Sequence, residues 1–593
     1  MKRIVSLVLV LVLSLGIVAT LSSCGKAPKD EGAQIAVYLG EEVYDFDPTD
    51  YYVNRNAEQL MSMLYEPLFR ISEKGKLELA AASDYSVNEE ERTIVINIGK
   101  SFWSDEVQLK AADYIYAWRE RILEPNNANP AAALFYDIEN AIQVKNGEKS
   151  IYDFGAVASD IYEITIKYRE GANYEQILRN LASVASSPAR QDIINTAPDH
   201  WSKSHTSIVT NGPFRISYID YDSNKFTLER NLGYHQSPDA VDFDNVVTPG
   251  ALVSFLNGTG EELLLSYEDI TNKTVFIMLD AGLDMRAESE SLATYTDDLS
   301  TYTYVFNTTN PLFANPKVRY ALSLALDRKA MAEAAVFAKA AESFVSSSIA
   351  DVLYEDLERP ISATADAIRA KEILDSVDLE GISMSFTLAV NDDEVSVALA
   401  KLAKSAWQAL GFNVSIKAVG TVKTTVYDQN MASDIEITDS GIQAMVKNAS
   451  YGTYEYDVIG LDWQMYSEDP FVALSAFTTY MNGCGTDFST GAYRMNISAW
   501  WSAEYDSLMA RAYTAKTPED RVAALRAAEA LLLESCPVIP VLYNCNFVFS
   551  SDLISKIETD GYGNFIFTKV KQKNYKNYLP APEEDEETED EGE

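Results

Sequence analysis

Few residues of this 593-residue chain are arranged for covalent chemistry. The three histidines, His200, His205 and His235, do not form an HExxH or other metal-binding pattern, and we expect His200 and His205 at the surface. The sequence also contains no GxSxG nucleophile elbow, Walker loop or Rossmann glycine pattern. These features indicate no catalytic residue, no metal site and no cofactor, and they favour a binding protein over an enzyme.

Three of the four cysteines give no sign of redox or zinc chemistry. Cys484, Cys536 and Cys545 contain no CxxC pair and no zinc-ligand spacing. One disulfide or buried free thiols both fit this number, and free thiols are the simpler interpretation. A disulfide-based scaffold is excluded.

The fourth cysteine ends a lipoprotein-like signal. Two basic residues precede an uncharged, mostly apolar stretch over residues 4–21, and Leu-Ser-Ser leads directly to Cys24. A membrane-spanning helix and an ordinary secretory signal are the alternatives, but a thiol after small residues is the acylation point of a lipoprotein. We predict a signal peptide over 1–23, a lipid on Cys24 and a tether over 24–33. The anchor would hold the protein at the extracytoplasmic face of the cell membrane, at the cell surface or in the periplasm.

The composition limits the partners. Asp and Glu total 89 against 48 Lys and Arg, which gives a formal net charge of −41. Such a field repels nucleic acid, so we expect no nucleic-acid partner. The hydrophobic content of 47% supplies large cores, and the length predicts several domains. Residues 578–593 are almost all acidic and predict a disordered tail.

Helical and strand patterns are interspersed, which predicts a mixed α/β (α+β) class. Strands are expected at 36–39, 92–98, 161–166, 302–306, 412–416 and 538–542, with a hairpin of 214–219 and 225–229 across 222–224. Helices are expected at 56–69, 109–123, 319–338, 395–410 and 518–534. Gly411 should end the fourth helix, and Thr517 should cap the fifth.

Six segments in order carry a family signature: 64–69 (LYEPLF), 100–118 (with Trp-Ser-Asp), 209–214, 228–231, 315–328 and 457–470 around Trp463. Together they resemble the oligopeptide- and dipeptide-binding proteins of ABC importers, the bacterial extracellular solute-binding protein family 5, in lipoprotein form. The resemblance covers residues 34–571. A Gly usual in the second segment is replaced by Glu106, which should alter a turn.

The resemblance implies a two-lobed periplasmic-binding-protein-like fold with an extra inserted domain. Lobe closure would trap a peptide, held mainly through its backbone, and pass it to a membrane permease without any cofactor. We expect a monomer. The implied division is lobe I over 34–69, 195–300 and 542–577, the inserted domain over 70–194, and lobe II over 301–541.

The resemblance also places ligand contacts in the loop 462–470. In the family's peptide binders an Asp three residues after the loop Trp pairs with the ligand's α-ammonium group, but here Tyr466 stands in its place. Either Asp462 or Glu468 replaces that charge, or the ligand has no free amino terminus. The alternative to a ligand role is structural: Trp463 and Tyr466 would be core aromatics, and Asp462 and Glu468 would be solvated or would cap a helix. The expected ligand residues are Asp462, Trp463, Gln464, Tyr466, Glu468, Tyr302 and Tyr304.

Other residues near these segments have structural interpretations. Arg319 should form an ion pair of its helix, and Asn211 with Gly212 should form a turn. Two other functions stay open. The missing Asp keeps a receptor for a non-peptide solute such as an oligosaccharide in view, and an exported lipoprotein hydrolase would need a site that the scarce histidines do not suggest.

Overall fold

The computed structural model describes residues 35–39, 43–49, 55–125, 129–198, 200–220, 225–238, 243–255, 277–278, 283, 286–287, 293–428, 432–481 and 496–574. The predicted signal peptide, Cys24, the tether, the hairpin turn 222–224, Cys484 and the acidic tail lie outside the described residues.

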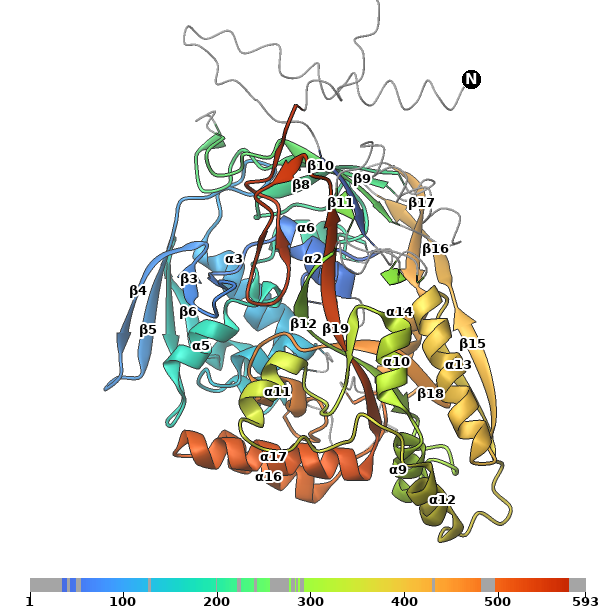
Figure 1. Ribbon diagram of the computed structural model, residues 1–593. Helices are drawn as coiled ribbons and strands as arrows, with labels where there is room; N and C mark the ends of the chain where they lie inside the picture. Colours follow the sequence, from blue (N-terminus) through green and yellow to red (C-terminus); the bar gives the residue numbers. More distant parts are fainter. Residues whose placement is uncertain are drawn as a thin grey trace, which may run out of the picture.

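A central sheet runs through the whole molecule (Figure 1). Within the described residues it has eleven strands in the order β15-β14-β18-β12-β19-β11-β1-β10-β9-β8, with β13 (Ala338–Ala340) paired to β19. Its two middle strands, β12 (Thr294–Phe306) and β19 (Val538–Ser550), are antiparallel and 13 residues long each. The first lobe holds β1 (Ile35–Leu39), β8 (Phe214–Asp220), β9 (Lys225–Arg230), β10 (Gly250–Phe255) and β11 (Ile277–Met278). The second lobe holds β14 (Ser385–Asn391), β15 (Asn413–Val419) and β18 (Val458–Gln464).

The two middle strands connect the lobes and contain an irregularity. The register of β12 against β19 shifts between Asp297 and Thr301, and again between Tyr302 and Thr303. Such bulges bend a strand and strengthen its twist. The predicted lobe boundaries at 300/301 and 541/542 fall inside these strands, and the full division into domains stays a prediction.

A second sheet stands apart at one flank of the molecule (Figure 1). Its order is β4 (Ala82–Asn88), β5 (Thr93–Ile98), β7 (Glu163–Lys167) and β6 (Ala156–Asp160). Its β-branched residues alternate between buried and partly exposed positions along β5. Helix α3 (Ala111–Tyr116), which continues as a π-helix over Ala117–Ile122, and α5 (Tyr174–Asn180) belong to the same stretch of chain.

Several helices confirm the sequence patterns, and one corrects them. Helix α13 (Glu394–Ala409) is followed by Gly411 at φ +100°, and α17 (Pro518–Ser535) begins after Thr517, whose side chain accepts from the backbone N–H of Asp520. The single helix expected over 319–338 is instead α9 (Pro316–Leu324) and α10 (Arg328–Ala335). The break arises because Asp327 takes a non-helical conformation and caps the second helix.

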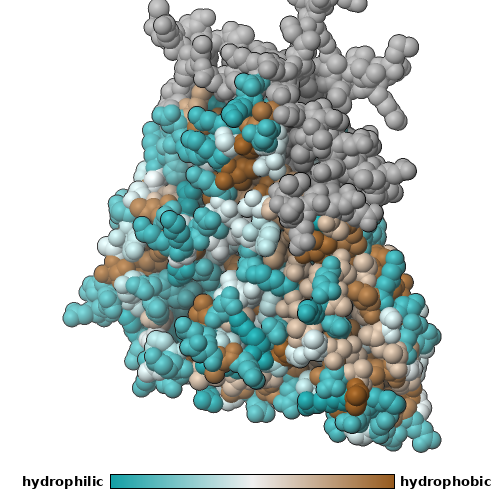
Figure 2. Space-filling view, viewed as in Figure 1, coloured by the Kyte–Doolittle hydropathy of each residue, from teal (hydrophilic) through white to brown (hydrophobic). Residues whose placement is uncertain are grey.

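Remaining elements cover the sheet and the lobe junction. Apolar residues are more frequent on the surface over α10 and α13 than over the flank of the second sheet (Figure 2). Within the described part of the chain, no helix combines the length and the apolar character needed to cross a bilayer. The helices not yet named are α2 (Arg55–Leu64), α11 (Ser347–Leu353), α12 (Ala367–Asp375), α14 (Gly441–Ser450), α15 (Pro470–Ser475) and α16 (Ala503–Tyr513).

Five side chains test individual predictions. Cys536 and Cys545 are buried free thiols, as expected. The surface position expected for His200 is wrong, because it is buried in a turn that packs on the first lobe, while His205 is partly buried against Tyr218. Arg319 forms no ion pair among the described residues. It is buried and donates to backbone carbonyls at the C-terminal end of α17.

Candidate functional site: the loop after β18 and the lobe junction

The predicted ligand loop leaves the end of β18 and enters α15. Asp469 caps α15 by accepting from the backbone N–H of Phe471 at 3.0 Å, and both of its carboxylate oxygens accept from Arg521 at 2.9 and 2.7 Å. The backbone N–H of Met465 donates to Leu299 of β12 at 2.8 Å. Both ends of the loop are therefore fixed to the second lobe and to the connecting strands.

Three predicted residues lie together around a cavity of about 10 Å³. Trp463, Gln464 and Tyr466 line it, and Pro130 closes it from the other side of the junction. Trp463 also stacks on Phe477 with centroids 5.3 Å apart, so it is both a core aromatic and a wall of this cavity. The ligand role of these residues stays a prediction.

The two acids of the loop have protein partners. Asp462 accepts from Nδ2 of Asn544 on β19 at 2.6 Å. Glu468 accepts from Nε of Arg179 on α5 at 3.1 Å and forms an ion pair with the same guanidinium. The neighbouring Ser467 donates to Oδ1 of Asn180 at 2.7 Å. The loop thus reaches across the junction and is closed against α5.

Tyr302 and Tyr304 do not join this cavity. Side chains alternate along a strand, and these two residues point with Phe306 into the hydrophobic core of the second lobe. There the ring of Tyr304 lies edge-on to Trp407 at 5.5 Å. Their ligand role, predicted from the resemblance, has no support in this position.

Sequence reasoning missed a buried acid next to the loop. Glu58 on α2 accepts from Nε2 of Gln464 and from Nδ2 of Asn564, the latter at 3.3 Å. Burial, and then the nearby carboxylates of Asp298 and Asp560, raise the pKa of Glu58 well above its ordinary value. Loss of hydration in the same surroundings raises the pKa of Asp560 to about 6. Buried carboxyl groups are thus gathered where α2, β18 and the C-terminal segment meet, and their surroundings disfavour the charged form.

A larger cavity also has Glu58 in its lining, and Trp463 does not line it. Its volume is about 90 Å³. Apolar and acidic side chains both line it, including Met63, Ala182, Val184, Phe214, Glu58, Glu66, Asp560 and Arg70.

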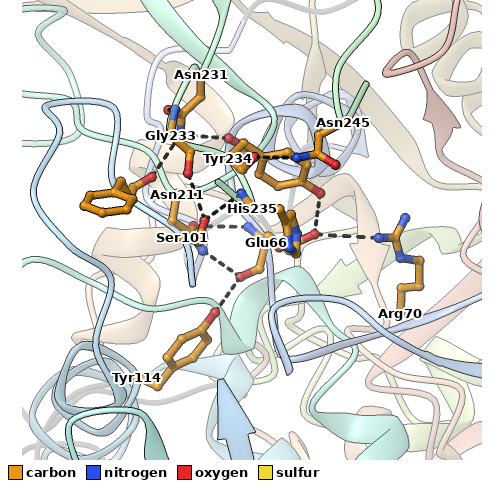
Figure 3. A network of polar contacts seen from close by, with 12 residues as sticks. Glu66, Arg70, Ser101, Tyr114, Asn211, Asn231, Gly233, Tyr234, His235 and Asn245 are labelled. Atoms are coloured by element: carbon orange, nitrogen blue, oxygen red, sulfur yellow. Dashed lines mark hydrogen bonds and ion pairs between the residues drawn. The ribbon is translucent and has the colours of Figure 1, made fainter. Parts of the chain in front are cut away.

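A polar network holds one wall of this cavity (Figure 3). The carboxylate of Glu66 accepts from Tyr234 and bonds to Nε2 of His235 at 2.7 Å, with Arg70 3.7 Å away. Burial acts to raise the pKa of Glu66, but His235 and Arg70 outweigh it and hold that pKa below its ordinary value. The carboxylate of Glu66 raises the pKa of His235.

The same network corrects the turn expected at residues 211–212. Asn211 is fully buried, accepts from the backbone N–H of Glu66 at 3.1 Å and donates to its carbonyl at 2.8 Å. Tyr114 donates to that carbonyl at 3.1 Å. Gly212 is needed because a Cβ there would lie 2.6 Å from the carbonyl oxygen of Leu64. The motif around Glu66 therefore joins the first lobe to α3.

Within the described residues, no group of three or more His, Cys, Asp or Glu side chains is placed to hold a metal ion. Two lobes joined by two long strands, with a loop of one lobe closed over the junction, define a two-lobed solute-binding protein. A model of the bacterial extracellular solute-binding proteins, family 5 (Middle), matches residues 76–480, and the chain belongs to this family.

Individual relatives agree with the family and the fold. The periplasmic oligopeptide-binding protein OppA of Haemophilus influenzae is 22% identical over 527 residues, which cover 87% of this chain and 89% of that protein. The dipeptide-binding protein DppE of Bacillus subtilis is 24% identical over 531 residues, 87% of this chain and 88% of DppE. The murein tripeptide binding protein MppA of Escherichia coli superposes with a TM-score of 0.73 at 20% identity, over 91% of this chain and 99% of MppA. The unliganded open form of MppA superposes with a TM-score of 0.53 at 20% identity, over 91% of this chain and 98% of MppA. The family resemblance seen in the sequence and the two-lobed fold are confirmed, and the lipoprotein form stays a prediction.

Proposed function

We propose that the protein is a lipid-anchored extracytoplasmic receptor that captures peptides by lobe closure and delivers them to the permease of an ABC importer. It acts by binding and not by catalysis. The observation that carries the proposal is the loop after β18, which belongs to the second lobe yet contacts Arg179 and Asn180 of α5 across the junction. A ligand held behind this loop would be buried on all sides.

Lobe closure fits the junction. Of the two MppA structures compared above, the unliganded open form superposes less well, with a TM-score of 0.53 against 0.73. The lobes of this protein are therefore arranged less like the open form, which supports a closed arrangement here. Opening requires β12 and β19 to bend, and their bulge at Asp297–Thr301 supplies a place for it. Trp463, Gln464 and Tyr466 would then line the open cleft.

The ligand class is tested by thermal unfolding with defined probes. We expect mixtures of di- to nonapeptides to raise the melting temperature, because binding stabilises by RT ln(1 + [L]/Kd), and oligosaccharides to leave it unchanged. Native mass spectrometry of the protein purified from its own cells then gives the ligand mass. Stabilisation by sugars alone, or cleavage of the added peptides, contradicts the proposal.

The anchor is tested separately. The full chain expressed in a bacterium should appear in the membrane fraction with an acylated Cys24, and Cys24→Ser should move it to the soluble extracytoplasmic fraction. Mass spectrometry of the N-terminal peptide identifies the lipid. A wild-type protein whose Cys24 carries no acyl group would overturn this part.

A further inference from the structure

Among the described residues, a buried carboxyl group at the lobe junction is hydrogen-bonded by neutral side-chain amides and by no cation. Glu58 is 4% exposed, and its hydrogen bonds come from the side-chain amides of Gln464 and Asn564. In the part of the chain that the structure describes, no Lys, Arg or His forms an ion pair with it. A carboxylate in such a place is costly unless a cation joins it.

The cavity beside Glu58 has two kinds of wall. Methionine, alanine, valine and phenylalanine side chains form the apolar part, and the carboxyl groups of Glu58, Glu66 and Asp560 interrupt it. Arg70 is the cation in this lining, and it pairs with Glu66. Apolar surface combined with unbalanced acid matches the side chain of Lys or Arg, which has an apolar stem and a charged end.

The side chain of Gln464 is an independent sign of a missing donor. It is 3% exposed, and its Oε1 has no hydrogen-bond partner among the described residues although its Nε2 donates to Glu58. A buried acceptor left unsatisfied costs free energy that a ligand donor would recover. Gln464 also lines the small cavity beside Trp463, so its amide lies between that cavity and Glu58.

Resting on the function proposed above, we propose that the cavity beside Glu58 is a subsite for a positively charged side chain of the captured peptide. The ligand's ammonium or guanidinium group takes the place of the Gln464 amide at Glu58. Oxygens of Glu58, Asp560 and Gln464 then serve as acceptors for its N–H donors, which number three in an ammonium group. The stem packs on the apolar wall. This subsite would supply charge recognition that Tyr466 does not.

The test is a set of alanine pentapeptides that carry one lysine, Nε-acetyl-lysine or norleucine at each position. Binding is measured by calorimetry, with and without N-terminal acetylation. We expect lysine at one position to bind at least about 10-fold tighter than the two uncharged residues, whether or not the amino terminus is acetylated. Equal affinities across the set overturn the subsite but leave peptide binding intact. Absence of all binding overturns the proposed function as well.

Variants of the protein test whether the preference for lysine arises in this cavity. Glu58→Gln should reduce the lysine preference to about 2-fold or less, and Gln464→Met should reduce it in part. Glu333→Gln, on the exposed side of α10, is the matched control and should keep the full preference. Thermal unfolding of each ligand-free variant checks the fold, and removal of the buried acid should not lower the melting temperature. A preference that survives in Glu58→Gln contradicts the proposal, as does its loss in Glu333→Gln.

Discussion

Arg179 on α5 forms an ion pair with Glu468 in the loop after β18. The two residues are 289 positions apart in the sequence, and their side chains are 28% and 29% exposed. Ser467 and Asn180 add a hydrogen bond beside the pair at 2.7 Å. The loop expected to contact the ligand is therefore also the element that fastens the closed junction.

This ion pair should set how fast a ligand leaves. Arg179→Gln and Glu468→Gln should each speed dissociation of a bound peptide, because the closed form loses an interaction that the open form does not make. A double-mutant cycle on the dissociation rate should give a coupling free energy of about 0.5–1 kcal/mol between the two side chains, as is usual for partly exposed ion pairs. Stopped-flow measurement of release provides the rates. The exposed Lys423–Glu436 pair of the β16–β17 hairpin (Thr421–Asp428, Ser433–Ser440) serves as control and should show no coupling. If the effects of Arg179→Gln and Glu468→Gln on the dissociation rate were purely additive, the ion pair would have no role in ligand release.

Local signals in the sequence were sufficient for many elements. The β-branched run at 93–98 became β5, and Thr517 and Gly411 mark helix ends as predicted. These features depend on neighbours within a few residues. The break after α9 was missed because the single helix predicted over 319–338 included Asp327, although Asp is a strong N-cap.

The polar contacts of the junction could not be predicted in the same way. Glu58 meets Gln464 and Asn564 across 406 and 506 positions, and Glu66 meets His235 across 169. In a chain with 89 acidic residues, no local pattern distinguishes a buried acid from a solvated one.

The pair of Glu66 and His235 should make stability depend on pH. Because the pKa of His235 is raised in the folded state, its contribution is complete below its unfolded value of about 6.5 and is lost as the pH rises through the folded value. The pKa of Glu66 is lowered, so its contribution is present above about 4.5 and is lost as the pH falls through its folded value. The pair should be most effective in weakly acidic solution.

Urea unfolding between pH 5 and 9 measures this effect. His235→Gln should lower the free energy of unfolding by about 1–3 kcal/mol near pH 6, and the difference from wild type should shrink toward pH 9. His205→Gln, which changes a partly buried histidine whose ring lies tilted against Tyr218, should retain the wild-type slope in this range. A constant difference between wild type and His235→Gln at all pH values would exclude the ion pair as the cause.

Glu106 occupies a turn in the left-handed region, with φ +67°. A side chain there costs about 1–2 kcal/mol, whereas glycine adopts the conformation freely but loses more entropy on folding. Glu106→Gly should therefore raise the free energy of unfolding by about 0.5–1 kcal/mol. Glu106→Ala is the matched control, since alanine keeps the Cβ, and it should change the free energy of unfolding by only a few tenths of a kcal/mol. Equal gains from both variants would assign the effect to charge instead of backbone strain. Peptide affinity should be the same in all three proteins.

Removal of the Arg319 side chain should strongly destabilise the second lobe. Its Nε donates to the carbonyls of Ser535 and Cys536 at 3.1 and 3.0 Å, and its guanidinium also bonds to the carbonyl of Phe313. Burial lowers the pKa of Arg319 to about 10, so it stays charged at neutral pH and supplies donors to the last carbonyls of α17.

Arg319→Met keeps most of the buried volume but leaves these carbonyls without donors. We expect the free energy of unfolding to fall by about 2–4 kcal/mol, as measured in urea at pH 7, because the unsatisfied buried carbonyls lose their donors, with no restoration at low salt because no ion pair is involved. Arg511→Met on the exposed face of α16 is the control and should stay within about 0.5 kcal/mol of wild type. A loss below about 1 kcal/mol in Arg319→Met would mean that water replaces the guanidinium at the end of α17, and the account of this residue as a buried helix cap would be wrong.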